Sequence, residues 1–312
     1  MGKEGKSGAK TDDIDAFAIA CWYFDKPETS YLKIRDPLVS RIKHICLRSD
    51  LLNRLQTPII NRMRQELAWQ CPEVALVPSA KLQDDLAPLL WGWLARRGKS
   101  KKYDRVLVGN HRLGHRAADS VGRQTMHCEI EEEIFKLKKQ LVQLIDSPQL
   151  TEYRRIFTRF GFGYQLQGEL LGAIYPLGDF LKDGRPEVKI RKNRQTGKES
   201  KLKLSERRFM RAVGMGVVRE DSGQKNKGKQ SGSALCRKAL WQWCLTGLEV
   251  SRNNPPLQLT YGRGENAEEM SPAENLRRRK KGGAPVKLAR LRVIARCMRE
   301  LFKELCAIVD RF

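Results

Sequence analysis

The sequence lacks the features that mark membrane-spanning, secreted and disulfide-bonded proteins. No apolar run approaches the ~18–20 residues of a transmembrane helix, and the opening segment MGKEGKSGAK has no apolar core of a signal peptide. None of the eight cysteines forms a CxxC pair. We therefore expect no membrane segment and no secretory signal. We expect the cysteines to be small buried hydrophobic residues rather than zinc ligands or disulfide partners.

Aromatic residues make up only 7% of the chain, and runs of β-branched residues are rare. Apolar residues instead recur three and four positions apart, so we expect a mainly α fold. The predicted helices cover 12–24, 34–69, 81–95, 128–145, 232–250 and 286–311. Pro58 lies inside the second of these and is expected to kink or split it, because its ring clashes with the preceding turn.

The segment CEIEEEIFKLKKQLVQLI, residues 128–145, has the clearest helical pattern. Its apolar stripe consists of Ile130, Ile134, Leu137, Leu141 and Leu144, with Glu and Lys on the other sides. Two heptads fit a coiled coil with a second chain and fit equally well a hairpin with 34–69. Both alternatives predict a long helical, coiled-coil-like arm within 34–150.

The charge is strongly unbalanced. The chain carries 60 Lys and Arg against 36 Asp and Glu, a net charge of +24 with a pI near 9.9. This excess favours polyanionic partners, DNA or RNA, and a cytoplasmic, nucleoid-associated location. The basic stretches 185–203 and 254–285 are expected to be flexible. We expect phosphate contacts from the first stretch and from Arg277, Arg278, Arg279 and Lys280 in the second.

The segment IFTRFGFGYQLQGELLGAIYPLGDF, residues 156–180, predicts two helices joined by a tight turn. Gly161 and Gly163 stand in that turn. A helix–hairpin–helix arrangement places such glycines where backbone amides approach a phosphate, with the dipole of the second helix assisting. Any tight turn between helices uses glycine, so the pattern by itself is weak.

The segment FMRAVGMGVVREDSGQKNKGKQSGSALCRKAL, residues 209–240, predicts a helix that ends at Gly214, an irregular basic loop and a second helix. Ser222 lies on the loop with Lys229 after it, and Arg237 lies on the second helix. A serine among cations is a candidate nucleophile toward a phosphodiester, with Ser231 and Ser233 as alternatives. An ordinary Ser-Gly turn explains the same letters.

The segment KTDDIDAFAIACWYF, residues 10–24, places three aspartates before an apolar helix. Asp12 and Asp15 are three residues apart and share one helix face. Acidic residues are favoured in the first turn of any helix, with Thr11 as its cap. The alternative is a pair of metal-binding carboxylates.

Taken together and in this order, KTDxxDA, a helical arm, FGFG and GMG…SG…KxxxxxxxxR resemble the DEDD-type insertion-sequence transposases, a family of RNA-guided recombinases. The resemblance covers nearly the whole chain, although RFGFG stands where the family has Ile-Pro-Gly-Ile-Gly. It implies five regions: 1–33, a C-terminal remnant of a RuvC-like (RNase H-fold) domain; 34–150, the arm; 151–253, a transposase domain with a helix–hairpin–helix turn and serine loop; 254–285, a basic flexible segment; and 286–312, a packing helix.

The resemblance also implies a chemistry. Ser222 matches the family's serine nucleophile, and Asp12 and Asp15 match the last two of four carboxylates that hold Mg²⁺. The family places its first two carboxylates well upstream, and only about ten residues precede Asp12 here. We therefore expect an incomplete chain whose site needs a further segment. The implied partners are DNA, a structured guide RNA and further copies of the chain, as a dimer or tetramer through the arms.

Two other interpretations fit the sequence. One is a non-catalytic nucleic-acid-binding remnant of such a transposase, which keeps the basic surface and the arm. The other is an unrelated basic helical protein that binds RNA.

Overall fold

The computed structural model describes residues 16–17, 20–21, 36–70, 72, 89–101, 113–192, 197, 199–220, 227–250, 254–262 and 267–309. Contacts divide the chain into two units, Met1–Pro37 and Leu38–Phe312. In the first unit residues 16–17 and 20–21 are helical, within the predicted helix 12–24. Asp12 and Asp15 lie outside the described residues.

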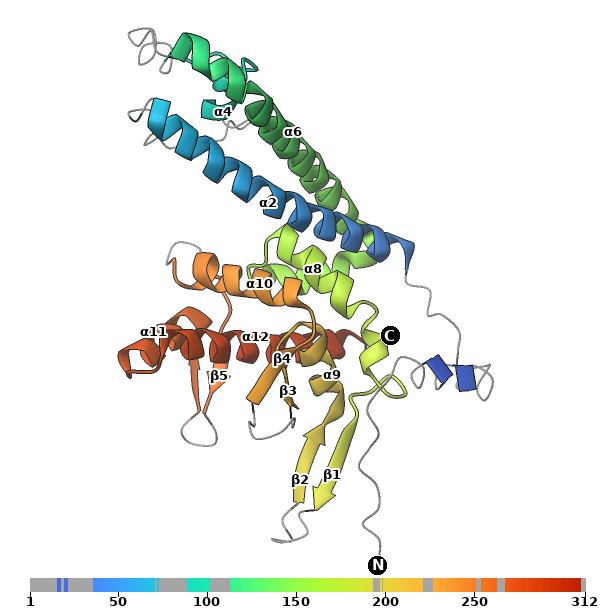
Figure 1. Ribbon diagram of the computed structural model, residues 1–312. Helices are drawn as coiled ribbons and strands as arrows, with labels where there is room; N and C mark the ends of the chain where they lie inside the picture. Colours follow the sequence, from blue (N-terminus) through green and yellow to red (C-terminus); the bar gives the residue numbers. More distant parts are fainter. Residues whose placement is uncertain are drawn as a thin grey trace, which may run out of the picture. The chain divides into compact units, whose positions relative to one another are not determined.

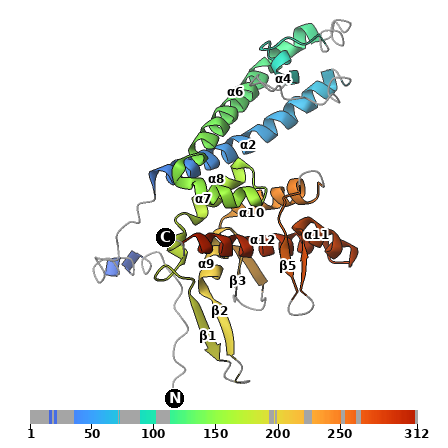
Figure 2. The ribbon, with the colours of Figure 1, turned by 180° about the vertical axis from the view of Figure 1, so that it is seen from behind.

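The described part of the chain is mainly helical, as predicted. Its longest helices are α2 (Pro37–Gln70) and α6 (Leu113–Ile145), which form an antiparallel pair (Figures 1 and 2). Ion pairs show that the two helices run antiparallel. Arg48 contacts Glu133, whereas Glu66, about five turns further along α2, contacts Arg123, which is earlier in α6. We call this pair, with the short helix α4 (Leu89–Leu94) between its far ends, the arm.

The apolar stripe of 128–145 is buried within the arm, so the hairpin alternative is the one observed. Ile130 and Ile134 pack with Leu52 of α2, and Leu141 and Ile145 pack further down with Ile42 and Ile45. At the far end a third cluster contains Met63, Leu67, Leu90, Trp91, Leu94 and Cys128. Burial of these side chains stabilises the pairing of the two helices.

Pro58 does not split the second predicted helix, because α2 continues unbroken from Pro37 to Gln70. A proline removes one helical hydrogen bond and crowds the preceding turn. Here Leu52 on one side of Pro58 and Met63 on the other are both buried in the arm. Packing on both sides therefore holds the helix through the proline, and the prediction of a split was wrong.

Below the arm a helical core contains η2 (Pro148–Leu150), α7 (Thr151–Arg159), α8 (Tyr164–Ile174), η3 (Leu177–Phe180), α9 (Leu204–Ala212), α10 (Ala234–Trp243), α11 (Pro272–Lys281) and α12 (Val286–Val309). A π-helical turn, η4 (Cys244–Leu248), continues α10. Helix α12 contacts α7, α9, α10 and α11, and α8 packs on α6 and α10. The central apolar residues include Phe157, Phe160, Phe209, Met298 and Leu301.

Most of the described cysteines are buried, as predicted. Cys46, Cys128, Cys236, Cys244, Cys297 and Cys306 are all buried and form no disulfide with one another. Burial raises the pKa of the Cys236 and Cys244 thiols to about 11. These thiols therefore pack as small hydrophobic side chains.

Three two-stranded antiparallel hairpins complete the described structure. They pair β1 (Val188–Lys192) with β2 (Glu199–Lys203), β3 (Gly216–Glu220) with β4 (Lys227–Ser231), and β5 (Leu259–Tyr261) with β6 (Glu268–Met270). The first and third lie in the stretches predicted to be flexible, 185–203 and 254–285. The described residues of both stretches form regular strands, and helix α11 lies in the second stretch.

The second stretch is held by its own buried residues. Leu257, Leu259, Met270, Ala273 and Leu276 are all under 5% exposed. Ser271 caps α11 by accepting a hydrogen bond from the Glu274 N–H at 3.1 Å. Because the stretch is strongly charged overall, its buried apolar residues were not recognised from the sequence.

No helix among the described residues is long and apolar enough to cross a bilayer.

Candidate functional site

The hairpin β1–β2 concentrates positive charge on an open surface. Five of its ten strand residues are Lys or Arg, and one is acidic. The strand register places Val188, Ile190 and Lys192 opposite Lys203, Lys201 and Glu199 on one face. On the other face Lys189 and Arg191 lie opposite Leu202 and Ser200. Nine of these ten residues are exposed, Ile190 by 64%.

The base of this hairpin is fixed to α9. The Glu187 N–H donates to the Ser205 hydroxyl at 2.8 Å, and the Leu204 N–H donates to the Glu187 carbonyl at 2.9 Å. Arg208 donates to the Glu187 carboxylate at 2.8 Å. The strands therefore leave the core from an ordered base, and their side chains are almost all exposed.

The predicted nucleophile Ser222 lies outside the described residues, between strands β3 and β4. Lys229 stands in β4, opposite Val218 of β3. The irregular basic loop that we predicted is thus flanked by a regular hairpin. Of the alternative serines, Ser233 is the N-cap of α10 and accepts a hydrogen bond from the Cys236 N–H at 3.1 Å.

The start of α10 is packed closely against the end of α9. Gly232 has φ +96°, and a Cβ built there would lie 1.6 Å from the Arg211 carbonyl oxygen. Arg237, predicted to bind nucleic acid, donates to the Gly214 carbonyl at 3.1 Å and is half-buried. Arg237 therefore satisfies a carbonyl at the end of α9.

The predicted turn at Gly161 and Gly163 is present as a short connection between α7 and α8. Gly161 has φ +65°, a backbone conformation that glycine adopts without strain. Its neighbour Phe162 is buried against Phe160 and Trp243. A Cβ at Gly163 would meet nothing within 4 Å, so this part of the turn faces open space.

The four basic residues predicted to contact phosphate lie on α11 and already have partners within the fold. Arg278 pairs with Glu268, and Arg279 donates to the Asn275 amide oxygen at 2.8 Å. Lys280 donates to Glu249 at 2.6 Å. Arg277 donates to the Asn254 amide oxygen at 3.0 Å in the amide orientation that satisfies both groups.

Glu249 joins α11 to α12. It also accepts hydrogen bonds from Arg290 at 2.8 and 3.0 Å. These bonds, with the one from Lys280, hold the pKa of the Glu249 carboxyl below its usual range. The α11 cations thus contribute to an internal network as well as to the surface charge.

The described residues bear little on the predicted Mg²⁺ site. Asp12 and Asp15 lie outside them, and in the described ranges no group of three His, Cys, Asp or Glu side chains is arranged to hold a metal. The Mg²⁺ site therefore stays a prediction.

The hairpin fold of 185–203 is the site feature that sequence reasoning missed. Its signal is a weak alternation of apolar and basic residues in VKIRK and KLK, on either side of a segment with Gly197. The sequence as a whole matches no protein-family model, and a search of curated proteins found no match.

Proposed function

We propose that the chain binds nucleic acid through the hairpin β1–β2, as part of a transposase of the DEDD insertion-sequence family. One observation carries the binding proposal: this hairpin exposes Lys189, Arg191, Lys192, Lys201 and Lys203, and nine of its ten strand residues are exposed. A two-stranded hairpin of this kind is marginally stable in water by itself. A polyanionic partner supports it, because phosphates neutralise the five exposed cations of its strands.

The dimensions of the hairpin suit duplex nucleic acid. The major groove of B-form DNA admits a two-stranded β-ribbon. Lys192, Lys201 and Lys203 on one face and Lys189 and Arg191 on the other then lie toward opposite groove walls. Exposed Val188 and Ile190 share the face of Lys192, Lys201 and Lys203 and lie toward the same groove wall.

The transposase part of the proposal rests on the resemblance. In the proposed reaction the Ser222 hydroxyl attacks a DNA phosphorus atom and forms a phosphoserine bond, while the displaced DNA oxygen leaves as a hydroxyl group. Reversal with a second DNA end completes strand exchange. Lys229 and the turn at Gly161 and Gly163, in a helix–hairpin–helix role, hold phosphates. A guide RNA and Mg²⁺ at Asp12 and Asp15 belong to the same proposal.

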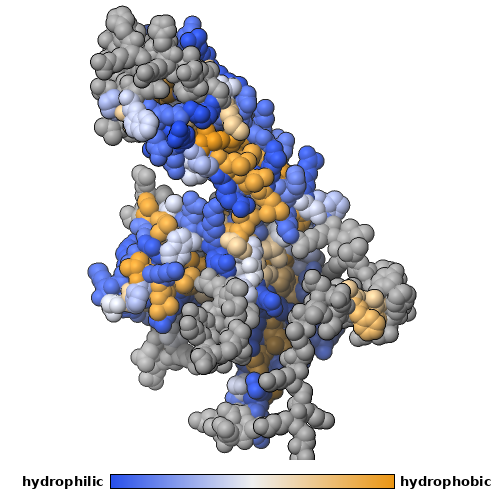
Figure 3. Space-filling model, viewed as in Figure 1, coloured by the Kyte–Doolittle hydropathy of each residue, from blue (hydrophilic) through white to orange (hydrophobic). Residues whose placement is uncertain are grey.

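A homo-oligomer also belongs to the proposal, although its surface differs from the one first expected. The stripe Ile130–Ile134–Leu141 is used within the chain. On the outside of α2, Leu47, Leu51 and Leu55 repeat every four residues and are 43–50% exposed. Figure 3 shows hydrophobic residues gathered in a band along the arm. This outer stripe is the surface that we assign to a second copy.

The second candidate function is a non-catalytic nucleic-acid-binding protein. The engagement of Arg237 with the Gly214 carbonyl favours it, because that arginine is then not available to a scissile phosphate in this conformation. Ser222→Ala, compared in the presence of the further segment that the site is expected to need, separates the two. A transposase loses strand cleavage and keeps DNA binding, whereas a binding protein shows no cleavage before or after the substitution.

The binding proposal is tested by the salt dependence of affinity for duplex DNA, measured by fluorescence anisotropy. The double variant Lys192→Gln/Lys201→Gln should reduce the slope of log K against log salt by about 1.8, at ~0.9 per lost phosphate contact. The matched control Lys136→Gln/Lys139→Gln removes two exposed charges from the arm and should change the slope by less than about 0.5. Equal effects of the two double variants would show that the hairpin is not the binding surface.

A further inference from the structure

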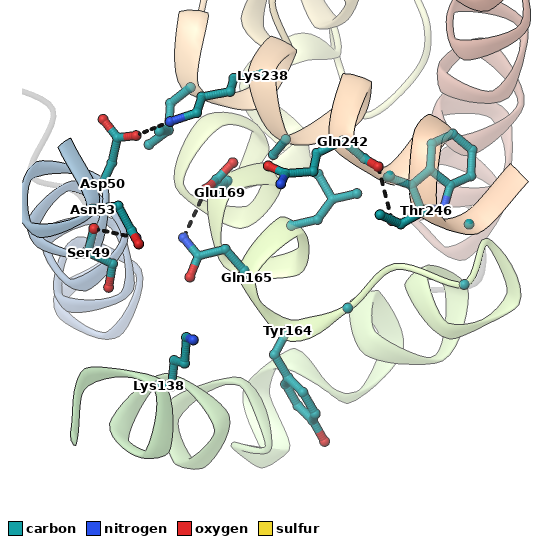
Figure 4. A pocket seen from close by; sticks show the side chains of 17 residues that line it. Ser49, Asp50, Asn53, Lys138, Tyr164, Gln165, Glu169, Lys238, Gln242 and Thr246 are labelled. Atoms are coloured by element: carbon teal, nitrogen blue, oxygen red, sulfur yellow. Dashed lines mark hydrogen bonds and ion pairs between the residues drawn. The ribbon is translucent and has the colours of Figure 1, made fainter. Parts of the chain in front are cut away.

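A cavity of about 790 Å³ lies at the junction of the arm and the helical core. Side chains reach it from α2, α6, α8 and α10 (Figure 4). The turn with Gly161 and Gly163 forms another part of its wall. Sites for small organic ligands usually have volumes of about 300–1,000 Å³. The cavity is large enough for a small organic ligand. Apart from Gly161 and Gly163, none of the residues predicted to catalyse or to bind nucleic acid or metal is among those that line it.

Three buried polar atoms in the wall of this cavity have no hydrogen-bond partner. They are Ser49 Oγ on α2, Glu169 Oε2 on α8 and Trp243 Nε1 on α10. The three residues are 2%, 7% and 6% exposed. A buried polar atom left unpaired costs about 1–3 kcal/mol, and each such atom in a native fold requires an explanation. All three residues line one cavity, so a polar ligand bound there could supply the missing partners.

The hydrogen bonds already present restrict what this ligand can offer. Glu169 Oε1 accepts from Gln165 Nε2 at 2.9 Å, which leaves Oε2 to face the ligand. Burial raises the pKa of Glu169 to about 7, so its Oε2 carries a proton over much of the neutral range. The Trp243 indole can only donate. A group that presents several acceptors on a rigid edge satisfies these atoms together.

The charges of the cavity are arranged by depth. Glu169 is deep, whereas Lys138 and Lys238 are exposed at the rim. Lys238 is held by Asp50 at 2.7 Å, and Asp50 also pairs with Arg54. In the interior Glu169 offers a free anion no positive charge, and above pH 7 its carboxylate repels one. A ligand with an uncharged polar end and an anionic group behind it matches the arrangement.

We propose that the cavity receives an unpaired base of single-stranded nucleic acid, which Ser49, Glu169 and Trp243 bind through its edge. The adjacent phosphate lies at the rim beside Lys138. Unpaired bases are recognised in this way, extruded into a pocket and hydrogen-bonded along their edges. Ring nitrogens and exocyclic oxygens of the base supply acceptors for the unpaired groups of Ser49, Glu169 and Trp243. This inference rests on the proposed nucleic-acid binding, and it assigns a separate surface from the hairpin β1–β2.

The test compares two labelled single-stranded DNA 15-mers, one intact and one with abasic residues at its five central positions. Full-length protein should bind the intact strand about tenfold more tightly, a difference of ~1.4 kcal/mol. Ser49→Ala and Trp243→Phe should each reduce this ratio toward one and leave the affinity for the abasic strand unchanged. Circular dichroism and the melting temperature establish that each variant is folded.

Glu169 provides a paired test of the same idea. Glu169→Gln keeps the shape of the side chain and a donor at its end, so the ratio should remain above about fivefold. Glu169→Leu removes the polar atoms and should abolish the ratio. If the leucine variant does not fold, Ser49→Ala, whose deletion is a single oxygen atom, decides.

A hairpin variant separates this inference from the proposed function. Lys192→Gln/Lys201→Gln should weaken both 15-mers by one common factor and preserve their ratio. Equal affinity of wild-type protein for both strands overturns the cavity proposal and leaves nucleic-acid binding intact. A ratio that survives all the cavity variants also overturns it, because the base is then bound elsewhere. Absence of binding to either strand overturns the cavity proposal, whereas absence of binding to duplex DNA overturns the proposed function.

Discussion

The arm and the hairpin β1–β2 are both antiparallel pairs of elements, yet they treat their side chains in opposite ways. The arm buries its apolar residues between α2 and α6 and pairs its charges, as in Arg48–Glu133 and Arg97–Glu129. The hairpin leaves Ile190 64% exposed and carries five cations against one acid. The inner face of the arm is therefore paired within the chain, whereas both faces of the hairpin expose apolar or basic side chains.

The largest expected effect breaks this comparison directly. Ile134 is 2% exposed in the arm, so Ile134→Lys should lower the free energy of unfolding by about 3–5 kcal/mol through lost packing and a buried charge. Ile190→Lys, the same substitution in the hairpin, should change it by less than about 0.5 kcal/mol. Urea denaturation followed by circular dichroism measures both. Similar losses in the two variants would mean that the hairpin is covered in solution.

The strongly periodic helices were predictable from the sequence. The stripe of 286–311 appears as α12, and that of 128–145 as the second half of α6. Their apolar residues recur on one face, so local pattern and tertiary packing agree. The pattern could not decide what the stripe packs against. That depended on α2, whose residues are about 80 positions earlier in the chain.

The hairpins and the cavity could not be predicted, for two different physical reasons. Strands β1 and β2 contain almost no buried residues, so apolar alternation, which normally reveals a strand, is nearly absent. Ser49, Glu169 and Trp243 line one cavity only because the three helices that carry them pack together. No spacing along the chain relates these positions. Ser222, Asp12 and Asp15 lie outside the described residues, and their roles stay predictions.

The second prediction contrasts a buried carboxyl with the solvated charges of the hairpin. Burial raises the pKa of Glu169 from 4.5 to about 7, with Asp50 adding to the rise and Gln165 and Lys238 opposing it. The folded pKa lies above the unfolded one, so this group stabilises the fold most below pH 4.5. That contribution is lost between pH 4.5 and 7. Between pH 4.5 and 7 the free energy of unfolding of the wild type should fall by about 3 kcal/mol at most relative to that of Glu169→Gln.

Unfolding of both proteins at pH 4.5 and pH 7.5 provides the measurement, since the difference between them cancels the titration of other groups. Glu199→Gln in the hairpin is the matched control. Its carboxyl is exposed, so the variant should differ from wild type by less than about 0.5 kcal/mol at either pH. A constant difference between wild type and Glu169→Gln would contradict the prediction.

The third prediction concerns the outer face of the arm, the one part of it that resembles the hairpin in exposing apolar residues. Leu51→Lys/Leu55→Lys should weaken self-association at least tenfold, ~1.4 kcal/mol, because charges replace apolar contact with a second copy. Multi-angle light scattering across a concentration series measures the mass. The melting temperature of the monomer should stay within a few degrees, since both leucines are 43–50% exposed. A wild-type protein that is monomeric at every concentration would show that the stripe is not an interface.

The smallest effect concerns the charges of the arm. The Arg48–Glu133 pair has an N–O distance of 2.8 Å, but its side chains are 46% and 42% exposed. Exposed pairs contribute ~0.2–1 kcal/mol and are screened by salt. A double-mutant cycle with Arg48→Gln and Glu133→Gln should therefore give a coupling free energy of less than about 1 kcal/mol, which disappears near 1 M NaCl.

Arg48→Gln should also leave the affinity for duplex DNA nearly unchanged, because Glu133 already compensates this cation. Lys201→Gln should instead weaken DNA binding and leave the free energy of unfolding nearly unchanged. If Arg48→Gln weakens DNA binding as much as Lys201→Gln does, net charge alone governs the affinity, and the distinction between a self-compensated arm and an uncompensated hairpin carries no function.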